Sequence, residues 1–424
     1  MSGSGADVIV IGGGVAGLSV ARELARWGTR VTLVERGRLG AEASWAAAGM
    51  LAPQIEADAR DEFFDFACSN RDAYPAFAAA LREETGIDIE LDRTGTLALA
   101  FTEEDEREGA RRFEWQQRDG LLVERLSPSE VLSLEPHLSA RVRGALRFPL
   151  AWQVENRRLC DALARASRLA GVRVLEETRA LALRLRGGRF VSVETSRGTL
   201  DAGAVVVACG AWSSLLSVET SGGEAEGAVF IIDGGDAARP SSPTGAAQSS
   251  PSASAPAADE DANARRSPRI EPVRGQILCY AMRGGEPLAR HVVYGAGGYI
   301  VPRRDGRLLA GTTTERAGFD KSVTEGGRRA IRVCAEGIAP AVADLKIVDE
   351  WAGLRPRAED ELPVLGASGE IENLFYATGH YRNGILLAPL TGALVAEMIT
   401  SGATPAPLAP FSPARFRPDA PRAA

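Results

Sequence analysis

The chain has 424 residues, 45% of them hydrophobic, and a formal net charge of −7 at pH 7. This length exceeds that of one compact domain and is enough for two packed cores. The negative net charge, together with the lack of a stripe of Lys and Arg residues in the sequence, argues against a nucleic-acid partner. The five cysteines have neither metal nor redox spacing, and their odd number argues against a disulfide framework. We therefore expect a cytoplasmic protein that binds no metal.

The first forty residues predict a strand–helix–strand unit. Residues 8–11 are an unalternated β-branched run, as in a strand covered on both faces. No basic residue precedes this run, so it is not expected to be a signal peptide. A helical pattern at 18–25 ends at Gly28, and residues 31–34 predict a second buried strand. No run of 18 or more apolar residues predicts a membrane span.

The rest of the chain predicts further helices and strands. Helical patterns cover residues 62–84, 103–118, 159–169 and 390–399. Strand-like runs cover residues 95–100, 172–175, 205–208, 276–279, 299–301, 308–311 and 374–377. We expect the strand at 205–208 in the first sheet and the strand at 95–100 in a separate region.

Composition changes sharply between residues 219 and 268, where Ala, Ser, Pro, Gly and Asp dominate. Such a segment cannot bury enough apolar surface to offset the entropy cost of ordering. It is therefore predicted to be a disordered insertion, in which only residues 229–232 are a candidate for strand pairing. The end of the chain, residues 413–424, is predicted to be a flexible tail.

A glycine-rich loop, residues 12–17, matches G-x-G-x-x-G between a predicted strand and a predicted helix. Gly12 allows the tight turn, Gly14 lets a pyrophosphate approach the backbone, and Gly17 lets helix and strand pack closely. Glu35 ends the second strand, where a carboxylate accepts hydrogen bonds from ribose hydroxyls. The pattern predicts FAD or NAD rather than NADP.

The segment after Glu35, residues 43–53 (ASWAAAGMLAP), is rich in small residues. Taken alone, it fits either a loop against a flat ring and a second phosphate or the start of a tightly packed helix. Together with residues 12–17, Glu35, 207–213 (VACGAWS) and 378–389 (TGHYRNGILLAP), it resembles the D-amino-acid oxidase family of flavoproteins. The likeness covers nearly the whole chain, apart from the insertion and the tail. It is strongest to the members that oxidise glycine for thiamine biosynthesis.

The resemblance implies an α/β fold in which noncovalent FAD lies extended across a Rossmann-like domain. A smaller α+β domain with a mixed or antiparallel sheet would cover the reactive face of the flavin. On this basis the FAD-binding domain is expected at residues 1–85, 141–218 and 351–412. The substrate domain is expected at 86–140 and 269–350.

The resemblance also assigns cofactor contacts. The phosphates would meet the glycine-rich loop at Gly12, Gly14, Val15, Ala16 and Gly17, and the ribose would meet Glu35 and Arg36. Ala43, Ser44, Ala48, Gly49 and Met50 would wrap the pyrophosphate and flavin, and Ala180 would hold the adenine. The ring would be bordered by His380, Tyr381, Arg382, Asn383, Gly384, Ile385 and Leu386. A helix is predicted after this last segment, and its N-terminal dipole favours negative charge on reduced flavin.

At the substrate end, Arg355 lies in residues 351–356 (WAGLRP), which resemble the family motif that binds a substrate carboxylate. A guanidinium presents parallel N–H donors that fix both the position and the orientation of a carboxylate. The resemblance adds Tyr299 and Arg382 as further pocket residues. None of the three histidines belongs to a recognisable nucleophile triad, so no side-chain general base is expected. The alternatives are a surface arginine, a half-buried strand tyrosine and a structural loop contact. Met50 is a candidate for limiting substrate size.

The implied reaction is oxidative deamination of glycine, or of small amines such as sarcosine or D-alanine. A hydride passes from the α-carbon to the flavin, dioxygen reoxidises it to give hydrogen peroxide, and the imino acid yields glyoxylate or enters thiazole assembly. A homotetramer and a thiazole synthase partner are implied as well. The alternatives are a sarcosine oxidase, a D-amino-acid oxidase, a quinone-linked D-amino-acid dehydrogenase and a non-catalytic flavoprotein subunit.

Overall fold

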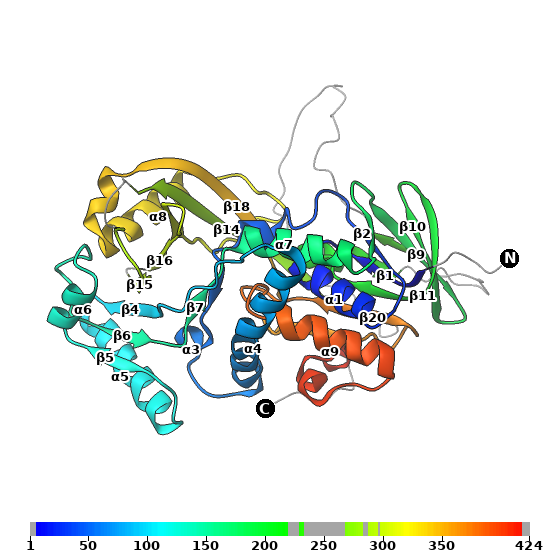
Figure 1. Ribbon diagram of the computed structural model, residues 1–424, viewed down its shortest axis with the longest axis horizontal. Helices are drawn as coiled ribbons and strands as arrows, with labels where there is room; N and C mark the ends of the chain where they lie inside the picture. Colours follow the sequence, from blue (N-terminus) through cyan, green and yellow to red (C-terminus); the bar gives the residue numbers. More distant parts are fainter. Residues whose placement is uncertain (1–5, 219–228, 233–267, 283–286, 296, 418–424) are drawn as a thin grey trace, which may run out of the picture.

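The computed structural model describes residues 6–218, 229–232, 268–282, 287–295 and 297–417 (Figure 1). Most of the segment predicted to be disordered, 219–268, and the end of the predicted tail, 418–424, lie outside the described residues. Within that segment, strand β13 (Val229–Ile232) pairs with β9 (Ala180–Arg186) and β12 (Leu216–Val218). The single strand expected there is thus confirmed.

The first sheet has a parallel centre in the order β20, β11, β1, β2, β8. The bounds are β20 (Leu374–Thr378), β11 (Gly198–Val207), β1 (Ala6–Ile11), β2 (Val31–Val34) and β8 (Arg173–Leu175). Antiparallel strands extend the sheet at β9 and β10 (Arg189–Thr195), and β19 (Val364–Ala367) pairs with β20. The strand predicted at 205–208 therefore belongs to this sheet, as expected.

Strand β1 shows why its sequence is apolar without alternation. Val8 and Val10 pack in a cluster with four helices, whereas Ile9 and Ile11 pack in a second cluster with residues of β9 and β10. Both faces are thus covered, and each face of the strand needs apolar side chains. The helices are α1 (Val15–Arg26), α4 (Glu62–Thr85), α7 (Asn156–Leu169) and α9 (Ala388–Ser401).

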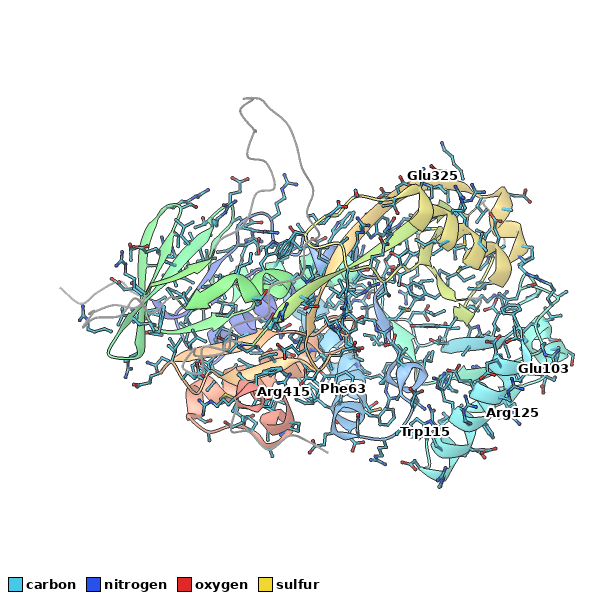
Figure 2. All side chains as sticks on the ribbon, turned by 180° about the vertical axis from the view of Figure 1, so that it is seen from behind. Phe63, Glu103, Trp115, Arg125, Glu325 and Arg415 are labelled. Atoms are coloured by element: carbon cyan, nitrogen blue, oxygen red, sulfur yellow. The ribbon has the colours of Figure 1, made fainter. Side chains whose placement is uncertain are left out.

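The helix ends follow from local capping. Helix α7 begins before the predicted residue 159, because the Glu155 carboxylate accepts a hydrogen bond from the amide of Arg158. Helix α5 (Glu103–Arg118) has the predicted bounds, because Thr102 and Asp105 form a capping box. Figure 2 shows Glu103 of α5 near one end of the molecule and Arg415 near its middle.

The second sheet has the strand order β18, β14, β17, β16, β15, β4, β6, β5. Its bounds are β18 (Lys346–Ala358), β14 (Ile270–Ala281), β17 (Arg307–Gly311), β16 (Gly298–Pro302), β15 (Val292–Gly295), β4 (Thr96–Ala100), β6 (Gly144–Phe148) and β5 (Glu124–Leu126). It is mixed, since β15 and β4 are parallel and the other pairs antiparallel. Helices α6 (Pro128–Leu134) and α8 (Glu325–Ile338) cover one face. The strand at 95–100 lies in this separate sheet, as predicted.

Strand pairing argues for moving two of the expected domain boundaries. Strand β6 was expected in the FAD-binding domain, but it pairs with β4 and β5 of the second sheet. Strand β18 pairs with β14 over nearly its whole length and does not change sheet at residue 351. We therefore propose boundaries after Phe148 and Ala358. Within the described residues, no helix has the length and apolar character to cross a membrane.

Candidate functional site

A cavity of about 510 Å³ lies between the two sheets, a volume typical of small-molecule sites. One wall is the uncovered face of the second sheet, where Ile277, Val301 and Trp351 pack beside the small residues of segment 43–50. The predicted residues that line this larger cavity are Gly14, Val15, Ala16, Ala43, Ser44, Ala48, Gly49, Met50, Tyr299, Arg355, His380, Tyr381, Arg382, Asn383, Gly384 and Ile385.

A smaller cavity of about 120 Å³ continues the larger one along the end of the first sheet. The two share Gly14, Ala43 and Ser44 in their walls, so together they form an elongated track. The predicted residues Gly12, Glu35, Arg36 and Ala180 line this smaller cavity. The track therefore joins the glycine-rich loop and Glu35 to the cavity that Arg355 lines.

Two predicted residues line neither cavity. Gly17 lies at the first turn of α1, where an added Cβ would collide with the carbonyl oxygen of Gly12. Its role is the close packing of helix and strand that the motif predicts. Leu386 is buried in the helix-side core of the first sheet. Because Leu386 lines neither cavity, its predicted contact with the flavin ring remains a proposal.

The start of α1 has the donors that a phosphate needs. Gly12 adopts a φ of 110°, and its missing side chain leaves room for the backbone of Ala208. The amide of Val15 donates to the Ser44 hydroxyl at 3.1 Å. The amides of Gly14 and Ala16 have no acceptor within the described residues, although both residues line the larger cavity. Unpaired amides at a helix start form an anion site.

Glu35 is held at the end of β2 by two backbone amides. Its carboxylate accepts hydrogen bonds from Gly13 at 2.7 Å and from Gly37 at 2.9 Å. Beside it, the Arg36 guanidinium stacks on Trp212 at 3.6 Å, in the wall of the smaller cavity. The sequence favoured Trp212 as a packing residue only. Its closeness to Arg36 depends on the fold and has no local signal.

Segment 43–50 combines the two alternatives that its composition left open. Residues Ala43–Ala46 form the short helix α2, and a loop follows. Its carbonyl groups are held from outside the cavity: Asn156 donates to Ser44 and Trp45, and the Trp351 indole donates to Ala46.

The loop after α2 has amides free for a ligand. The Arg303 guanidinium donates to the carbonyl of Ala48 at 2.9 Å. The amides of Ala48 and Gly49, by contrast, have no acceptor within the described part of the chain, and both residues line the larger cavity. Free donors on small residues, at the side of a cavity, fit a flavin ring and its phosphates.

Arg355 lies in the cavity wall with its charge uncompensated. Its guanidinium donates to the Thr312 hydroxyl at 2.8 Å and to the Thr313 carbonyl at 3.2 Å. Both acceptors are neutral, and no acidic side chain of the described residues forms an ion pair with Arg355. A guanidinium has five N–H donors, so three remain for a ligand. This is the state expected of a carboxylate anchor.

Tyr299 is buried beside Arg355. Burial raises the pKa of Tyr299, while the nearby Arg355 guanidinium opposes that rise, and the hydroxyl is hydrogen-bonded to Thr312. The phenol is therefore protonated at neutral pH and able to donate. Tyr299 thus lies with Arg355 at one cavity wall, as the sequence predicted.

Arg382 and His380 differ from Arg355. The Arg382 guanidinium pairs with Glu56 at 3.2 Å and is partly exposed. Burial lowers the pKa of His380 to about 4, so its ring is neutral at neutral pH. The amide of Tyr381 donates to Pro356, which ties this segment to the strand that carries Arg355.

Sequence reasoning missed Glu56, Tyr294 and Thr312 in the cavity wall. The Tyr294 hydroxyl donates to the Met50 sulfur at 3.0 Å, and Tyr294 lies opposite Tyr299 in the β15–β16 hairpin. The glycine-rich turn between the two strands was a usable signal for that pairing. Nothing local marks Thr312 or Glu56.

The fold and the track together define a dinucleotide-binding protein with a second cavity beside the dinucleotide site. A family model described as FAD dependent oxidoreductase (DAO) matches residues 7–236 and 246–398. The chain belongs to this family, and FAD is its cofactor.

Comparison with individual proteins shows which members of the family this chain resembles. Over 408 residues the chain is 36% identical to the glycine oxidase of Geobacillus kaustophilus (strain HTA426), covering 96% of each chain. The crystal structure of glycine oxidase from Geobacillus kaustophilus superposes with a TM-score of 0.82 at 35% identity, over 97% of this chain and 99% of that one. The bifunctional protein ThiO/ThiG of Synechocystis sp. (strain ATCC 27184 / PCC 6803 / Kazusa) is 32% identical, over 97% of this chain and 54% of its own length.

Proposed function

We propose that this protein oxidises glycine, and more slowly other small amines such as sarcosine or D-alanine, with dioxygen as electron acceptor. The imino acid is released as glyoxylate or supplied to thiamine thiazole assembly. The observation that carries the proposal is the uncompensated guanidinium of Arg355 in the wall of the larger cavity. The likeness to glycine oxidases over nearly the whole chain supports the choice of substrate.

In this proposal the chain holds the substrate and orients it. Arg355 binds the carboxylate with two parallel N–H donors, and the Tyr299 hydroxyl adds a third hydrogen bond. Bound FAD supplies the hydride acceptor, which dioxygen regenerates with formation of hydrogen peroxide. Orientation of bound reactants lowers barriers by roughly 7–11 kcal/mol in favourable cases, so positioning is the main contribution of these residues.

Several cofactor contacts stay part of the proposal. The amides of Gly14 and Ala16 would hold the pyrophosphate, and those of Ala48 and Gly49 would face the flavin. Glu35 would accept from the adenosine ribose, and the backbone of Ala180 would hold the adenine. No residue lining the larger cavity in the described part of the chain is a cysteine, which favours a noncovalent flavin.

Substrate size would be limited by the contact between Met50 and Tyr294 at the cavity wall. A homotetramer and transfer of the product to a thiazole synthase are proposed from the resemblance. The bifunctional ThiO/ThiG relative supports the second of these. A cytoplasmic location is proposed from the five cysteines, all unpaired.

Anaerobic titration of the purified, FAD-loaded protein tests the substrate directly. We expect glycine to bleach the flavin absorbance more efficiently than sarcosine or D-alanine. Preference for sarcosine or D-alanine would favour a related oxidase instead, and reduction of a dye without oxygen consumption would favour a dehydrogenase. A spectrum that none of the three changes would favour a non-catalytic subunit.

Arg355→Ala tests the anchor. Because truncating one partner of a buried charge pair costs several kcal/mol, we expect kcat/KM for glycine to fall at least about 100-fold. Arg357→Ala is the matched control, since Arg357 lies on the same strand, pairs with Glu361 and lines neither cavity. Turnover by Arg355→Ala within about threefold of wild type would show the assignment to be wrong.

A further inference from the structure

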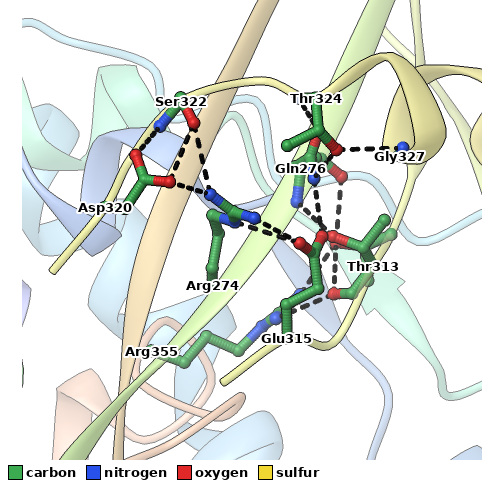
Figure 3. A network of polar contacts seen from close by, with 10 residues as sticks. Arg274, Gln276, Thr313, Glu315, Asp320, Ser322, Thr324, Gly327 and Arg355 are labelled. Atoms are coloured by element: carbon green, nitrogen blue, oxygen red, sulfur yellow. Dashed lines mark hydrogen bonds and ion pairs between the residues drawn. The ribbon is translucent and has the colours of Figure 1, made fainter. Parts of the chain in front are cut away.

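The sequence Arg274-Gly275-Gln276 on β14 has no role in the proposed reaction, yet it lies opposite Ala352–Leu354, the residues directly before Arg355 on the neighbouring strand. Gly275 pairs with Gly353, and a Cβ on Gly275 would collide with the Arg355 guanidinium. The guanidinium therefore lies directly over the backbone of β14 (Figure 3). Its two flanking residues, Arg274 and Gln276, face the segment that accepts hydrogen bonds from Arg355.

Gln276 holds that segment through its backbone. The Thr312 hydroxyl donates to the Gln276 carbonyl at 3.1 Å, and the Gln276 amide donates to the Thr313 hydroxyl at 3.1 Å. Thr312 and Thr313 are the two acceptors of Arg355. Thr312 is also hydrogen-bonded to Tyr299, so it is the shared partner of both proposed carboxylate ligands.

The Gln276 side chain is fully buried, and its polar atoms are all paired. Its amide nitrogen donates to Glu315 at 2.6 Å and to the Thr324 hydroxyl at 3.1 Å, while its oxygen accepts from the Thr324 amide at 2.8 Å. Thr324 caps helix α8 by accepting from Gly327 at 3.1 Å. Gln276 thus joins β14, the segment after β17 and the start of α8 (Figure 3).

Arg274 binds Glu315, the acidic residue of this segment. Its guanidinium pairs with Glu315 and with Asp320, each at 2.5 Å. Glu315, two residues after Thr313, therefore has one carboxylate oxygen on Arg274 and the other on Gln276. Both oxygens are thus held away from Arg355, and Glu315 forms no ion pair with it among the described residues. Fully satisfied buried polar groups of this kind hold a single arrangement.

We propose that Gln276 is a positioning residue for Arg355. Its backbone holds Thr312 and Thr313, and its side chain fixes the segment that follows them through Glu315 and Thr324, so that the Arg355 guanidinium is aimed into the cavity with its charge free for a substrate carboxylate. The inference rests on the proposed function, because it concerns the same anchor. Loss of the Gln276 side chain keeps the backbone hydrogen bonds to Thr312 and Thr313 but removes the bonds to Glu315 and Thr324, so the segment after Thr313 loses its buried attachment. Arg355 then loses its fixed orientation, and binding of carboxylates weakens before chemistry is affected.

The test measures carboxylate binding, independent of turnover. Acetate is titrated into the FAD-loaded protein, and its dissociation constant is read from the change in flavin absorbance. We expect Gln276→Leu to weaken acetate binding about tenfold, with a matching rise in KM for glycine. We expect kcat within twofold of wild type and full FAD occupancy.

A second pair of variants covers the case in which Gln276→Leu fails to fold. Thr312→Val removes the hydroxyl that joins Gln276 to Arg355 and keeps the volume, whereas Thr312→Ser keeps the hydroxyl. We expect acetate binding about threefold to tenfold weaker in Thr312→Val and near wild type in Thr312→Ser. Glu350→Gln is the control, because it breaks the Arg328–Glu350 pair on α8 without touching the cavity.

The outcomes separate this inference from the proposed function. Wild-type protein that binds acetate but does not oxidise glycine refutes the proposed function, and weaker acetate binding in the variants still supports the role of Gln276. If Gln276→Leu and Thr312→Val fold and bind acetate with wild-type affinity, the proposed role of Gln276 is overturned. A loss of kcat without a change in acetate affinity overturns it as well, as does a wild-type protein that binds no acetate.

Discussion

Arg355 and Arg382 line the same cavity, but their charges are in different states. Arg355 donates only to neutral oxygens, whereas Arg382 pairs with Glu56 near the surface. An exposed ion pair contributes at most about 1 kcal/mol and is screened by salt, and a carboxylate would have to displace Glu56 from it. Arg355 is therefore the proposed anchor, and Arg382 stays a proposed second pocket residue whose charge is already paired with Glu56.

His380 predicts a pH dependence of stability. Burial lowers the pKa of His380 from 6.5 to about 4, and its ring contacts the Thr391 hydroxyl at 3.0 Å. Below pH 6.5 the unfolded chain binds a proton that the folded state does not bind until about pH 4. Stability from this group is therefore complete above the unfolded pKa and falls as the pH falls through this window. The full loss is roughly 3 kcal/mol.

The measurement is urea unfolding of wild type and His380→Gln at several pH values. Other acidic groups titrate in both proteins, so the difference between the two free energies of unfolding isolates His380. We expect that difference to shift against wild type by roughly 3 kcal/mol between pH 6.5 and 4. Parallel curves would contradict the neutral, buried state of this ring.

Among the elements, the loop after α2 depends on a buried arginine from the second sheet. Arg303 donates to the carbonyls of Ala48 and Val154 and to the side chains of Gln153 and Asn156. Burial lowers the pKa of Arg303 to about 10, which leaves it charged at neutral pH. One side chain thus joins the loop that faces the flavin to the strand and helix behind it.

Arg303→Met is expected to weaken FAD binding about tenfold or more, because it leaves buried carbonyl and amide oxygens unpaired and releases the loop. Fluorescence titration of the apoprotein with FAD measures the effect. Arg304→Met is the matched control, since the neighbouring side chain is exposed and, among the described residues, has polar contacts only with Leu91 and, at 3.8 Å, with Asp88. Equal FAD affinity in both variants would show that Arg303 does not support the loop.

At the scale of the whole molecule, the β14–β18 pair joins the two cores. Ile277 of β14 lines the larger cavity and packs with Trp351 of β18, while Ile270 and Ala358 at the other end of the pair pack in the core of the first sheet. The β14–β18 pair runs between the two sheets (Figure 1). Residues of both sheets line the larger cavity. A ligand bound there contacts both and stabilises them together.

FAD is accordingly expected to raise the thermal midpoint of the apoprotein as one transition. Mass action predicts about 2.7 kcal/mol at a free FAD concentration of 100 times the dissociation constant. Calorimetry across an FAD series measures the shift, and riboflavin, which lacks the pyrophosphate and adenosine, serves as the comparison. A midpoint independent of FAD, or two transitions of which only one moves, would argue against a site shared by both sheets.

The sequence by itself determined the local features of this protein. The glycine-rich loop, Glu35 and the helix after them are close along the chain, and their geometry follows from backbone conformation and hydrophobic period. The same holds for the apolar strands, most helix bounds and the extended strand that carries Arg355. These features can be predicted from the sequence because each depends on residues that lie within about one helix or strand of each other along the chain.

Only the tertiary structure decided which residues meet at the substrate end. Gln276, Thr312 and Arg355 come from three separate segments, and Glu56 meets Arg382 across most of the chain. The places of β6 and the start of β18 in the second sheet likewise depend on strands far away in sequence. Hydrogen bonds and ion pairs between distant segments leave no period or spacing in the sequence, because only folding brings their partners together.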